Sequence, residues 1–185
     1  VDAGAMRIDV TLEKGGSELI RVVDNGCGIP PHELPLAVAS HATSKITDAD
    51  DLFRVHTLGF RGEALASISA VSQFILRSRV SGIDREGLSG AEKTLPNPAL
   101  AQAGSDVGYQ MEIAGGHASA VAPCGCPGGA TLEVRALFYN TPVRRKFLRT
   151  VTTELGHASE AFTRIALAHP DIHFSLTHNG RSVHD

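Results

Sequence analysis

The sequence predicts an α+β fold, in which a mixed, mostly antiparallel sheet carries helices on one face. Segments that alternate apolar and polar residues, as half-buried strands do, are interspersed with segments whose apolar residues recur at helical spacing. Several of the expected strands follow one another with only a short glycine turn between them, which favours antiparallel pairing. With 42% hydrophobic and 20% charged residues, a chain of 185 residues can form a packed core.

The chain opens with an expected hairpin. Residues 7–13 alternate apolar and polar side chains, which is the pattern of a half-buried strand. Gly15-Gly16 supplies the turn, and residues 19–23 form a second, more apolar strand that pairs with the first. This second strand runs directly into the loop 24–28, which contains two glycines.

Two helices and a strand are expected next. Residues 31–41 contain several apolar side chains, and Pro35 fits best in the first helical turn because proline lacks an N–H. Residues 63–71 follow a glycine-containing loop and are rich in Ala and Leu, which favour helix. The alternation of Phe74, Leu76 and their neighbours up to residue 79 indicates a strand.

The middle of the chain carries the weakest signals. Residues 81–129 are rich in Gly, Ala, Pro and Ser, and we expect only short strands near 109–113 and 117–122, joined by loops. Strand alternation returns at residues 131–137.

The last part of the chain contains the clearest helix. Residues 154–168 place their apolar side chains on one face, and Pro170 ends the helix. Residues 172–177 alternate as a strand, and Asn179-Gly180 is a typical hairpin turn.

Composition argues against several functional classes. The formal net charge of −3 argues against a protein that binds nucleic acid over its whole surface, although a local basic patch stays possible. No apolar run is long enough to cross a membrane. The cysteines read as free thiols of a reducing compartment, because Cys124 and Cys126 lack the second pair that tetrahedral zinc requires. We therefore expect no metal site made by residues of this chain.

The segment Asp24-Asn25-Gly26-Cys27-Gly28-Ile29 places a carboxylate at the end of a strand, beside two glycines. Glycine lets a ligand approach the backbone closely. A partly buried carboxylate accepts hydrogen bonds, so it suits the exocyclic amine of adenine and disfavours guanine, which presents a carbonyl there. The alternative interpretation is a plain Asx turn followed by glycine.

Two further segments have the chemistry of phosphate binding. Thr43 and Ser44 offer hydroxyl donors and Lys45 a positive charge, although the same residues also fit a solvated loop. Gly59 and Gly62 precede a helix, and the N–H groups of a helix N-terminus form an anion site. The alternative is a simple junction between loop and helix. The pattern GxxxxGK[ST] is absent, which excludes a P-loop ATPase.

Together these three segments, DNGCGI, HATSKI and LGFRGEALASI, resemble the motifs of the GHKL ATPase superfamily, whose nucleotide-binding domain has the Bergerat fold. A fourth segment, LFYNTPVRRKFL at residues 137–148, resembles the MutL branch of DNA mismatch repair proteins. The resemblance implies an ATP-binding domain at residues 1–150. It also implies a helix and hairpin at residues 151–185 that lead toward a second, transducer domain.

The resemblance implies a role for each motif. Asp24 is expected to bind the adenine amine, and Gly28 to let the base lie close. Residues 41–61 are expected to form a lid over ATP whose closure drives dimerisation, so that ATP acts as a conformational switch. The implied ATP-binding residues are Asp24, Asn25, Gly26, Gly28, Ile29, Thr43, Ser44, Lys45, Gly59, Phe60, Arg61, Gly62 and Thr131.

The sequence departs from the family in two places that concern the chemistry. The family's general-base Glu and its Mg²⁺-ligating Asn precede the position at which this chain begins, at Val1 without an initiator Met. We therefore expect an N-terminally truncated domain, with no catalytic residue in this chain, that binds ATP but does not hydrolyse it, although its parent protein does. The second departure is Ala130, where the family has Thr. The adjacent Thr131 should face the other way in a strand.

The resemblance also implies partners. These are a MutS-like mismatch-recognition protein, a second copy of the parent chain and DNA, in the bacterial cytosol or, for a eukaryotic source, the nucleus. Four cations are candidate DNA contacts, although they also fit a solvated basic turn: Arg144, Arg145, Lys146 and Arg149. Two alternatives stay open, namely another GHKL protein such as a gyrase-like topoisomerase, a heat-shock chaperone or a histidine kinase, and a DNA- or partner-binding module without a nucleotide.

Overall fold

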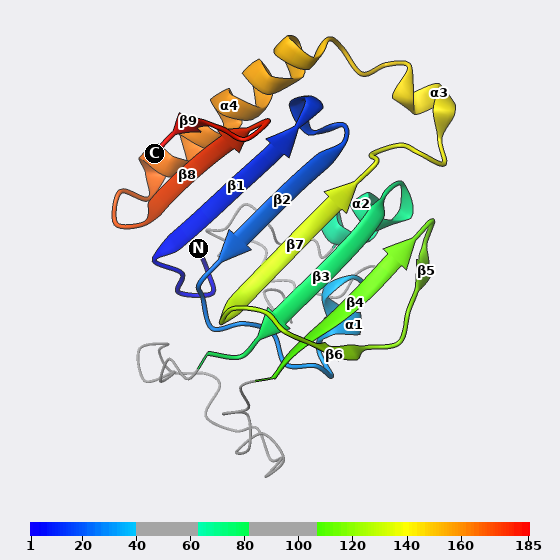
Figure 1. Cartoon of the computed structure of the whole chain (residues 1–185), viewed down its shortest axis with the longest axis vertical. Helices are drawn as coiled ribbons and strands as arrows, with labels where there is room; N and C mark the ends of the chain where they lie inside the picture. Colours follow the sequence, from blue (N-terminus) through cyan, green and yellow to red (C-terminus); the bar gives the residue numbers. More distant parts are fainter. Residues whose placement is uncertain (40–62, 82–106) are drawn as a thin grey trace, which may run out of the picture.

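The computed structural model describes residues 1–39, 63–81 and 107–185, and these form a single sheet of nine strands (Figure 1). The order of the strands is β5-β4-β3-β7-β2-β1-β8-β9, and β6 pairs with β4. The strands are β1 (Arg7–Glu13), β2 (Leu19–Asp24), β3 (Gln73–Arg79), β4 (Gly108–Ala114), β5 (His117–Ala118), β6 (Ala122–Cys124), β7 (Gly129–Arg135), β8 (His173–His178) and β9 (Arg181–His184). The helices are η1 (Lys14–Gly16), α1 (Leu34–Ala37), α2 (Ala64–Ala70), α3 (Pro142–Arg145) and α4 (Val151–Ala168).

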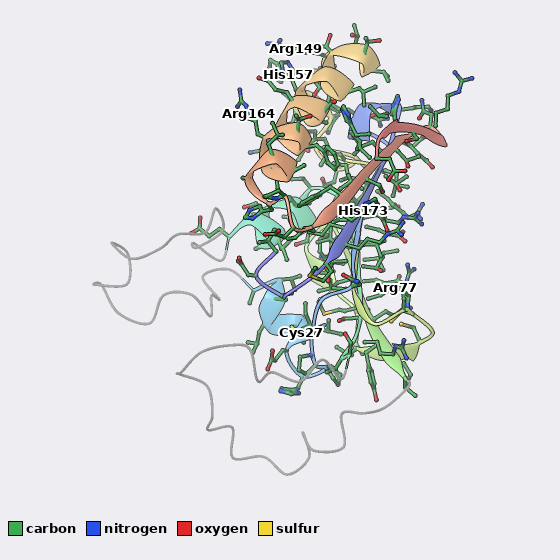
Figure 2. The ribbon with its side chains drawn as sticks, turned by 90° about the vertical axis from the view of Figure 1, so that its left-hand side faces the viewer. Cys27, Arg77, Arg149, His157, Arg164 and His173 are labelled. Atoms are coloured by element: carbon green, nitrogen blue, oxygen red, sulfur yellow. The ribbon has the colours of Figure 1, made fainter. Side chains whose placement is uncertain are left out.

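The sheet is mixed and mostly antiparallel, as the sequence predicts. β1 and β8 pair in parallel, and the other pairs between described strands are antiparallel. β8 follows α4 in the chain, and α4 lies against it. Figure 2 shows α1, α2 and α4 on the same side of the sheet, so the predicted arrangement of helices on one face is confirmed.

The main buried cluster lies between the sheet and the helices α1 and α2. Side chains of the three strands β3, β4 and β7 meet there, and Leu34 of α1 is fully buried among them. The alternation in the sequence explains this face, because Phe74 and Leu76 are buried while Ile75 between them points to the opposite side. The buried cluster consists of Leu34, Phe74, Leu76, Met111, Ile113 and Val134.

Some predicted boundaries were wrong. Within the described part of residues 31–41, only Leu34–Ala37 is α-helix, with Pro35 in its first turn as predicted. The strand predicted at 117–122 ends at Ala118, and a separate short strand, β6, begins at Ala122. The strand predicted at 131–137 spans Gly129–Arg135 instead.

The long helix begins earlier than predicted, because its N-cap is Thr150. The Thr150 hydroxyl accepts a hydrogen bond from the backbone N–H of Thr153 at 3.3 Å, which satisfies an amide that has no partner inside the helix. The Glu154 carboxylate accepts a bond from the backbone N–H of Arg149 at 2.8 Å and sits in the first turn, where negative charge stabilises a helix.

Within residues 151–185, β8 and β9 extend the same sheet, since β8 pairs with β1 over six residue pairs and β9 pairs with β8. Phe162 of α4 packs edge-on against Phe174 of β8, with ring centroids 6.0 Å apart. The predicted domain boundary at residue 150 stays a prediction. In the described part of the chain, no helix has the length and apolar character needed to span a membrane.

The face of the sheet away from the helices carries a buried ion network. Glu133 of β7 is only 4% exposed and lies between two arginines. Its carboxylate accepts bonds from Arg77 Nη1 at 2.8 Å and Arg135 Nη2 at 2.6 Å. Burial raises the pKa of Glu133, but the hydrogen bonds and charges of Arg135 and Arg77 outweigh it and leave the pKa below its usual range. Figure 2 shows Arg77 on this side of the sheet.

The lowered pKa of Glu133 makes part of the folding free energy depend on pH. A carboxyl whose pKa is lower in the folded state stabilises the fold above its unfolded-state pKa, and this stabilisation is lost as the pH falls through the folded-state pKa. We expect Glu133→Gln to lower the free energy of unfolding at pH 7 by about 1–2 kcal/mol. The difference from the unsubstituted chain should shrink below about pH 4.3. Urea unfolding at several pH values measures the free energy of unfolding of both chains. If their difference does not change with pH, the ion pairs of Glu133 do not cause the pH dependence.

Candidate nucleotide-binding site

Asp24, the residue expected to recognise a base, is the last residue of β2 and points to the helix face of the sheet. The register places it opposite Ile8 of β1 and Ala130 of β7. Its Oδ1 accepts a hydrogen bond from the backbone N–H of Gly26 at 2.9 Å, which is the Asx turn that the sequence allows. Within residues 1–39, 63–81 and 107–185, Oδ2 of Asp24 makes no hydrogen bond, so this oxygen can accept one from a ligand.

The side chain of Asn25 holds the chain together locally. Its Oδ1 accepts two hydrogen bonds, from the backbone N–H groups of Met6 and Arg7, both at 2.9 Å. These bonds tie the start of β1 to the end of β2. The amide oxygen of Asn25 is therefore already used within the protein.

Two glycines of the loop lie in places where a side chain does not fit. A Cβ on Gly26 would come within 2.7 Å of the Ala3 Cβ. Gly28 has a φ of +76°, and a Cβ there would collide with the backbone carbonyl of Arg79. Close packing on the end of β3 therefore accounts for Gly28, independently of any ligand.

A third glycine, Gly129, brings the start of β7 close to Asp24. Its φ is +104°, and a Cβ would collide with the backbone oxygen of Asp24. Gly129 was not among the residues expected to bind ATP. Its positive φ places the next residue, Ala130, directly opposite Asp24.

The register decides which face each residue of β7 presents. Ala130 pairs with Asp24 and therefore shares its face, whereas Thr131 pairs with Val23 and Arg77 and lies on the opposite face. The expectation that Thr131 faces the other way is confirmed. The inclusion of Thr131 among the ATP-binding residues is corrected accordingly, because its side chain lies on the opposite side of the sheet from the Asp24 carboxylate.

Two serines that the sequence analysis missed hold the loop after Asp24. The hydroxyl of Ser78, which is 1% exposed, accepts a bond from the Ile29 N–H and donates one to the Gly129 carbonyl, both at 2.7 Å. The Ser81 hydroxyl donates to the Gly26 carbonyl at 2.5 Å. One sequence signal was present, since Ser78 occupies a position of β3 where the alternation places apolar residues.

The residues expected to contact phosphates fall outside the described residues. These are Thr43, Ser44, Lys45, Gly59, Phe60, Arg61 and Gly62. What the structure describes is the helix that follows them, α2, whose first residue is Ala64. This helix lies against β3 and β4 on the helix face of the sheet. The register places Asp24 on that same face, in line with Ala130 and Ser78.

The basic cluster, Arg144, Arg145, Lys146 and Arg149, lies around and after α3, and all four side chains are exposed. Phe147, in the middle of the cluster, is 79% exposed. Figure 1 shows α3 beyond the upper edge of the sheet, whereas the Asp24 end of β2 lies at the lower edge. The structure therefore keeps the basic cluster apart from the Asp24 loop.

Among the described residues, the three thiols do not gather with other metal-binding side chains. Cys27, Cys124 and Cys126 are free and partly exposed. Burial and the neighbouring Cys126 sulfur raise the pKa of the Cys124 thiol. In the described residues, no group of three or more His, Cys, Asp or Glu side chains comes together as metal ligands would.

Known proteins resemble this chain over almost its whole length. It is 51% identical over 183 residues to the DNA mismatch repair protein MutL of Escherichia coli O1:K1 / APEC, covering 99% of this chain and 26% of that protein. It is 49% identical over 181 residues to MutL of Xanthomonas oryzae pv. oryzae strain PXO99A, covering 98% of this chain and 25% of that one. The chain is homologous to a part of MutL. It spans about a quarter of the length of these MutL relatives.

Solved structures agree with the sequence comparison. The Aquifex aeolicus MutL ATPase domain complexed with ADP superimposes with a TM-score of 0.71 at 32% identity, over 99% of this chain and 56% of that one. The N-terminal domain of a DNA repair protein superimposes with a TM-score of 0.70 at 25% identity, over 98% of this chain and 46% of that one. No family model matches the chain. The fold is thus that of the MutL ATPase domain.

Proposed function

We propose that this chain binds ATP on the helix face of the sheet, at the end of β2, as the nucleotide-binding module of a MutL-like DNA mismatch repair protein. The observation that carries the proposal is the Asp24 carboxylate. One of its oxygens is held by the Gly26 N–H at 2.9 Å, and the other has no partner in the described part of the chain. A carboxylate oriented in this way accepts a hydrogen bond from the adenine amine and repels the carbonyl of guanine.

The other candidate residues complete the proposed site in two groups. The backbone of Gly26, Gly28 and Ile29 forms the wall beside the base. Thr43, Ser44 and Lys45, together with the loop Gly59–Gly62, would bind the phosphates, where hydroxyl groups, a positive charge and free N–H groups stabilise negative charge. Mg²⁺ would accompany the phosphates and neutralise their charge. The described residues offer no cluster of ligands for it, so we assign none there.

At the level of the whole protein, we propose that ATP binding and hydrolysis act as a conformational switch. The closed, ATP-bound state would favour pairing of two copies and contact with a MutS-like mismatch-recognition protein, in the cytoplasm of a bacterium. Residues 151–185 would lead from this module toward a second domain. The support is the homology to MutL, which is a DNA mismatch repair protein in Escherichia coli and Xanthomonas oryzae.

Competition against a fluorescent, non-hydrolysable ATP analogue tests the proposed function. The 185-residue chain is titrated with the analogue in the presence of Mg²⁺, and unlabelled ATP and GTP are then used as competitors. The proposal expects saturable binding that ATP displaces at lower concentration than GTP. A folded chain that binds neither nucleotide, or that binds both equally, contradicts it. Phosphate release by the same preparation tests the expectation that the chain does not hydrolyse ATP, which stays a prediction.

The basic cluster supports a second proposal, that DNA contacts the end of the molecule around α3. Four exposed cations lie within six consecutive positions there, and the exposed ring of Phe147 lies between them. Cations that neutralise DNA phosphates release counterions, so the affinity falls steeply as salt rises. A solvated basic turn would show no such dependence.

We expect the chain to bind duplex DNA weakly, with an affinity that falls with salt concentration. The double substitution Arg144→Ala/Arg145→Ala should reduce the slope of log affinity against log salt by about 2, because each lost phosphate contact reduces it by about 1. Fluorescence anisotropy at several salt concentrations measures the slope. Arg164→Ala, on the exposed surface of α4, is the control. If the slope is unchanged in the double variant, the two arginines do not contact DNA phosphates and are only solvated.

A further inference from the structure

We infer that Ser78 and Ser81 are positioning residues that hold the loop after Asp24 in the geometry that selects an adenine base. This inference rests on the proposed function, because it concerns the same site. Both serines come from the end of β3, and the loop they hold, residues 25–29, lies about fifty positions earlier in the chain. The contact therefore exists only in the folded molecule.

The Ser78 hydroxyl joins three segments. It accepts a hydrogen bond from the Ile29 N–H and donates one to the Gly129 carbonyl, so both of its capacities are used within the protein. A hydroxyl that is 1% exposed and has two partners is held in one orientation. It thus fixes the far end of the loop relative to the start of β7.

Asp24 itself is held by the start of β7, to which Ser78 also binds. Gly129, whose carbonyl Ser78 binds, lies against the Asp24 backbone so closely that no Cβ fits between them. The residue after Gly129, Ala130, then pairs with Asp24 across β2 and β7. Ser78 therefore determines the position of both neighbours of the Asp24 carboxylate, the loop that follows it and the strand beside it.

Ser81 holds the middle of the loop. Its hydroxyl donates to the Gly26 carbonyl at 2.5 Å, and its backbone N–H donates to the Cys27 carbonyl at 3.2 Å. Gly26 is also the residue whose N–H binds Asp24 Oδ1 at 2.9 Å. A displacement of Gly26 would therefore rotate the carboxylate and change where its second oxygen points.

A positioning role and a merely structural role make different predictions for nucleotide selectivity. Loss of stability alone removes folded protein and lowers the signal for ATP and GTP in the same proportion. A loosened loop instead lets the Asp24 carboxylate move away from the base edge. Such movement weakens ATP binding and relieves the repulsion of guanine, so the preference for ATP over GTP narrows.

The experiment compares Ser78→Ala, Ser81→Ala and Ser72→Ala in the competition assay described above. We expect Ser78→Ala to weaken ATP binding about five- to tenfold, the effect of losing one to two hydrogen bonds, and to narrow the preference for ATP over GTP. Ser81→Ala should change both quantities in the same direction and by less. Ser72→Ala removes a hydroxyl that is just as buried but bonds to Ile68 within its own segment, so both quantities should be unchanged.

The outcomes distinguish a failure of the positioning role from a failure of the proposed ATP site. If folded Ser78→Ala and Ser81→Ala bind ATP as tightly and as selectively as the unsubstituted chain, the positioning role is wrong, whatever Asp24 does. If Ser78→Ala does not fold, Ser81→Ala decides alone, since its partly exposed hydroxyl is less critical to folding. If the unsubstituted chain shows no ATP preference, or Asp24→Asn retains it, the proposed function fails and this inference fails with it.

Discussion

Asp24→Asn is expected to weaken the binding of an ATP analogue by about a hundredfold, which corresponds to about 2.7 kcal/mol. The reason lies in the Asx turn. The Gly26 N–H holds one oxygen of the side chain at 2.9 Å, so the amide of an asparagine would keep its oxygen there and turn its NH₂ group toward the base. Two donors would then face each other where the proposed site needs an acceptor opposite the adenine amine.

The measurement is saturation binding of the fluorescent ATP analogue, with circular dichroism to confirm that the variant is folded. Asp9→Asn is the matched control, because Asp9 is a partly buried aspartate of the adjacent strand that faces the other side of the sheet. There it binds Arg7 at 2.8 Å and Ser175 at 2.6 Å. The control should bind the analogue as the unsubstituted chain does. If the Asp24 and Asp9 variants bind the analogue with equal affinity, Asp24 does not contact the nucleotide.

Gly28→Ala is expected to cause the second large effect, a destabilisation of about 3 kcal/mol together with a loss of nucleotide binding. Two costs add at this position. The backbone of Gly28 has a φ of +76°, which an L side chain adopts only with strain. The added Cβ would also collide with the Arg79 carbonyl, which belongs to the backbone of β3 and cannot swing aside. The loop would have to leave the strand.

Gly4→Ala separates these two costs. Gly4 has a similar φ of +68°, but no atom lies within 4 Å of the position of its Cβ. We expect Gly4→Ala to show only the cost of the positive φ, about 1 kcal/mol. Urea unfolding of the unsubstituted chain, Gly4→Ala and Gly28→Ala measures the loss of stability that each substitution causes. If Gly28→Ala costs no more than Gly4→Ala, the close contact with Arg79 contributes nothing and the loop is held in another way.

The sequence predicted the elements whose signal is local. Alternation in residues 7–13 and 19–23 predicted the first hairpin, and the same period predicted that Thr131 faces away from its neighbour Ala130. The period of a strand is two residues, so the face of one residue determines the face of the next. The motifs around Asp24 and at residues 137–148 predicted the homology to MutL that the comparisons support.

What the sequence did not predict depends on contacts between distant segments. Ser78 looks like an isolated polar residue in a strand, and only the approach of Ile29 and Gly129 shows that both of its hydrogen bonds are used. Gly28 was interpreted as making room for a base, whereas the space at its Cβ position is filled by the backbone of Arg79. Both contacts join residues about fifty positions apart, and no local pattern records such pairings.

The start of α4 is a different case, because the sequence contains a local signal for it at Thr150, four residues before the predicted start. Thr150 followed by Thr153 is the spacing of an N-cap that bonds to the third helical residue, and the structure has this bond at 3.3 Å. The predicted start at Glu154 relied on the apolar face, whose first large member is Leu155. Capping residues therefore define the end of a helix better than its apolar face does.

Amide chemical shifts test most directly whether the nucleotide binds on the helix face of the sheet at the end of β2. A ¹⁵N-labelled sample of the 19.5 kDa chain is titrated with the non-hydrolysable ATP analogue and Mg²⁺. The account predicts that the largest shifts among the described residues occur in Asn25–Ile29 and at Ala130, with small shifts at Glu133 on the opposite face. Saturable shifts confined to the face of the sheet away from the helices, or to the basic cluster around α3, would contradict binding at the end of β2.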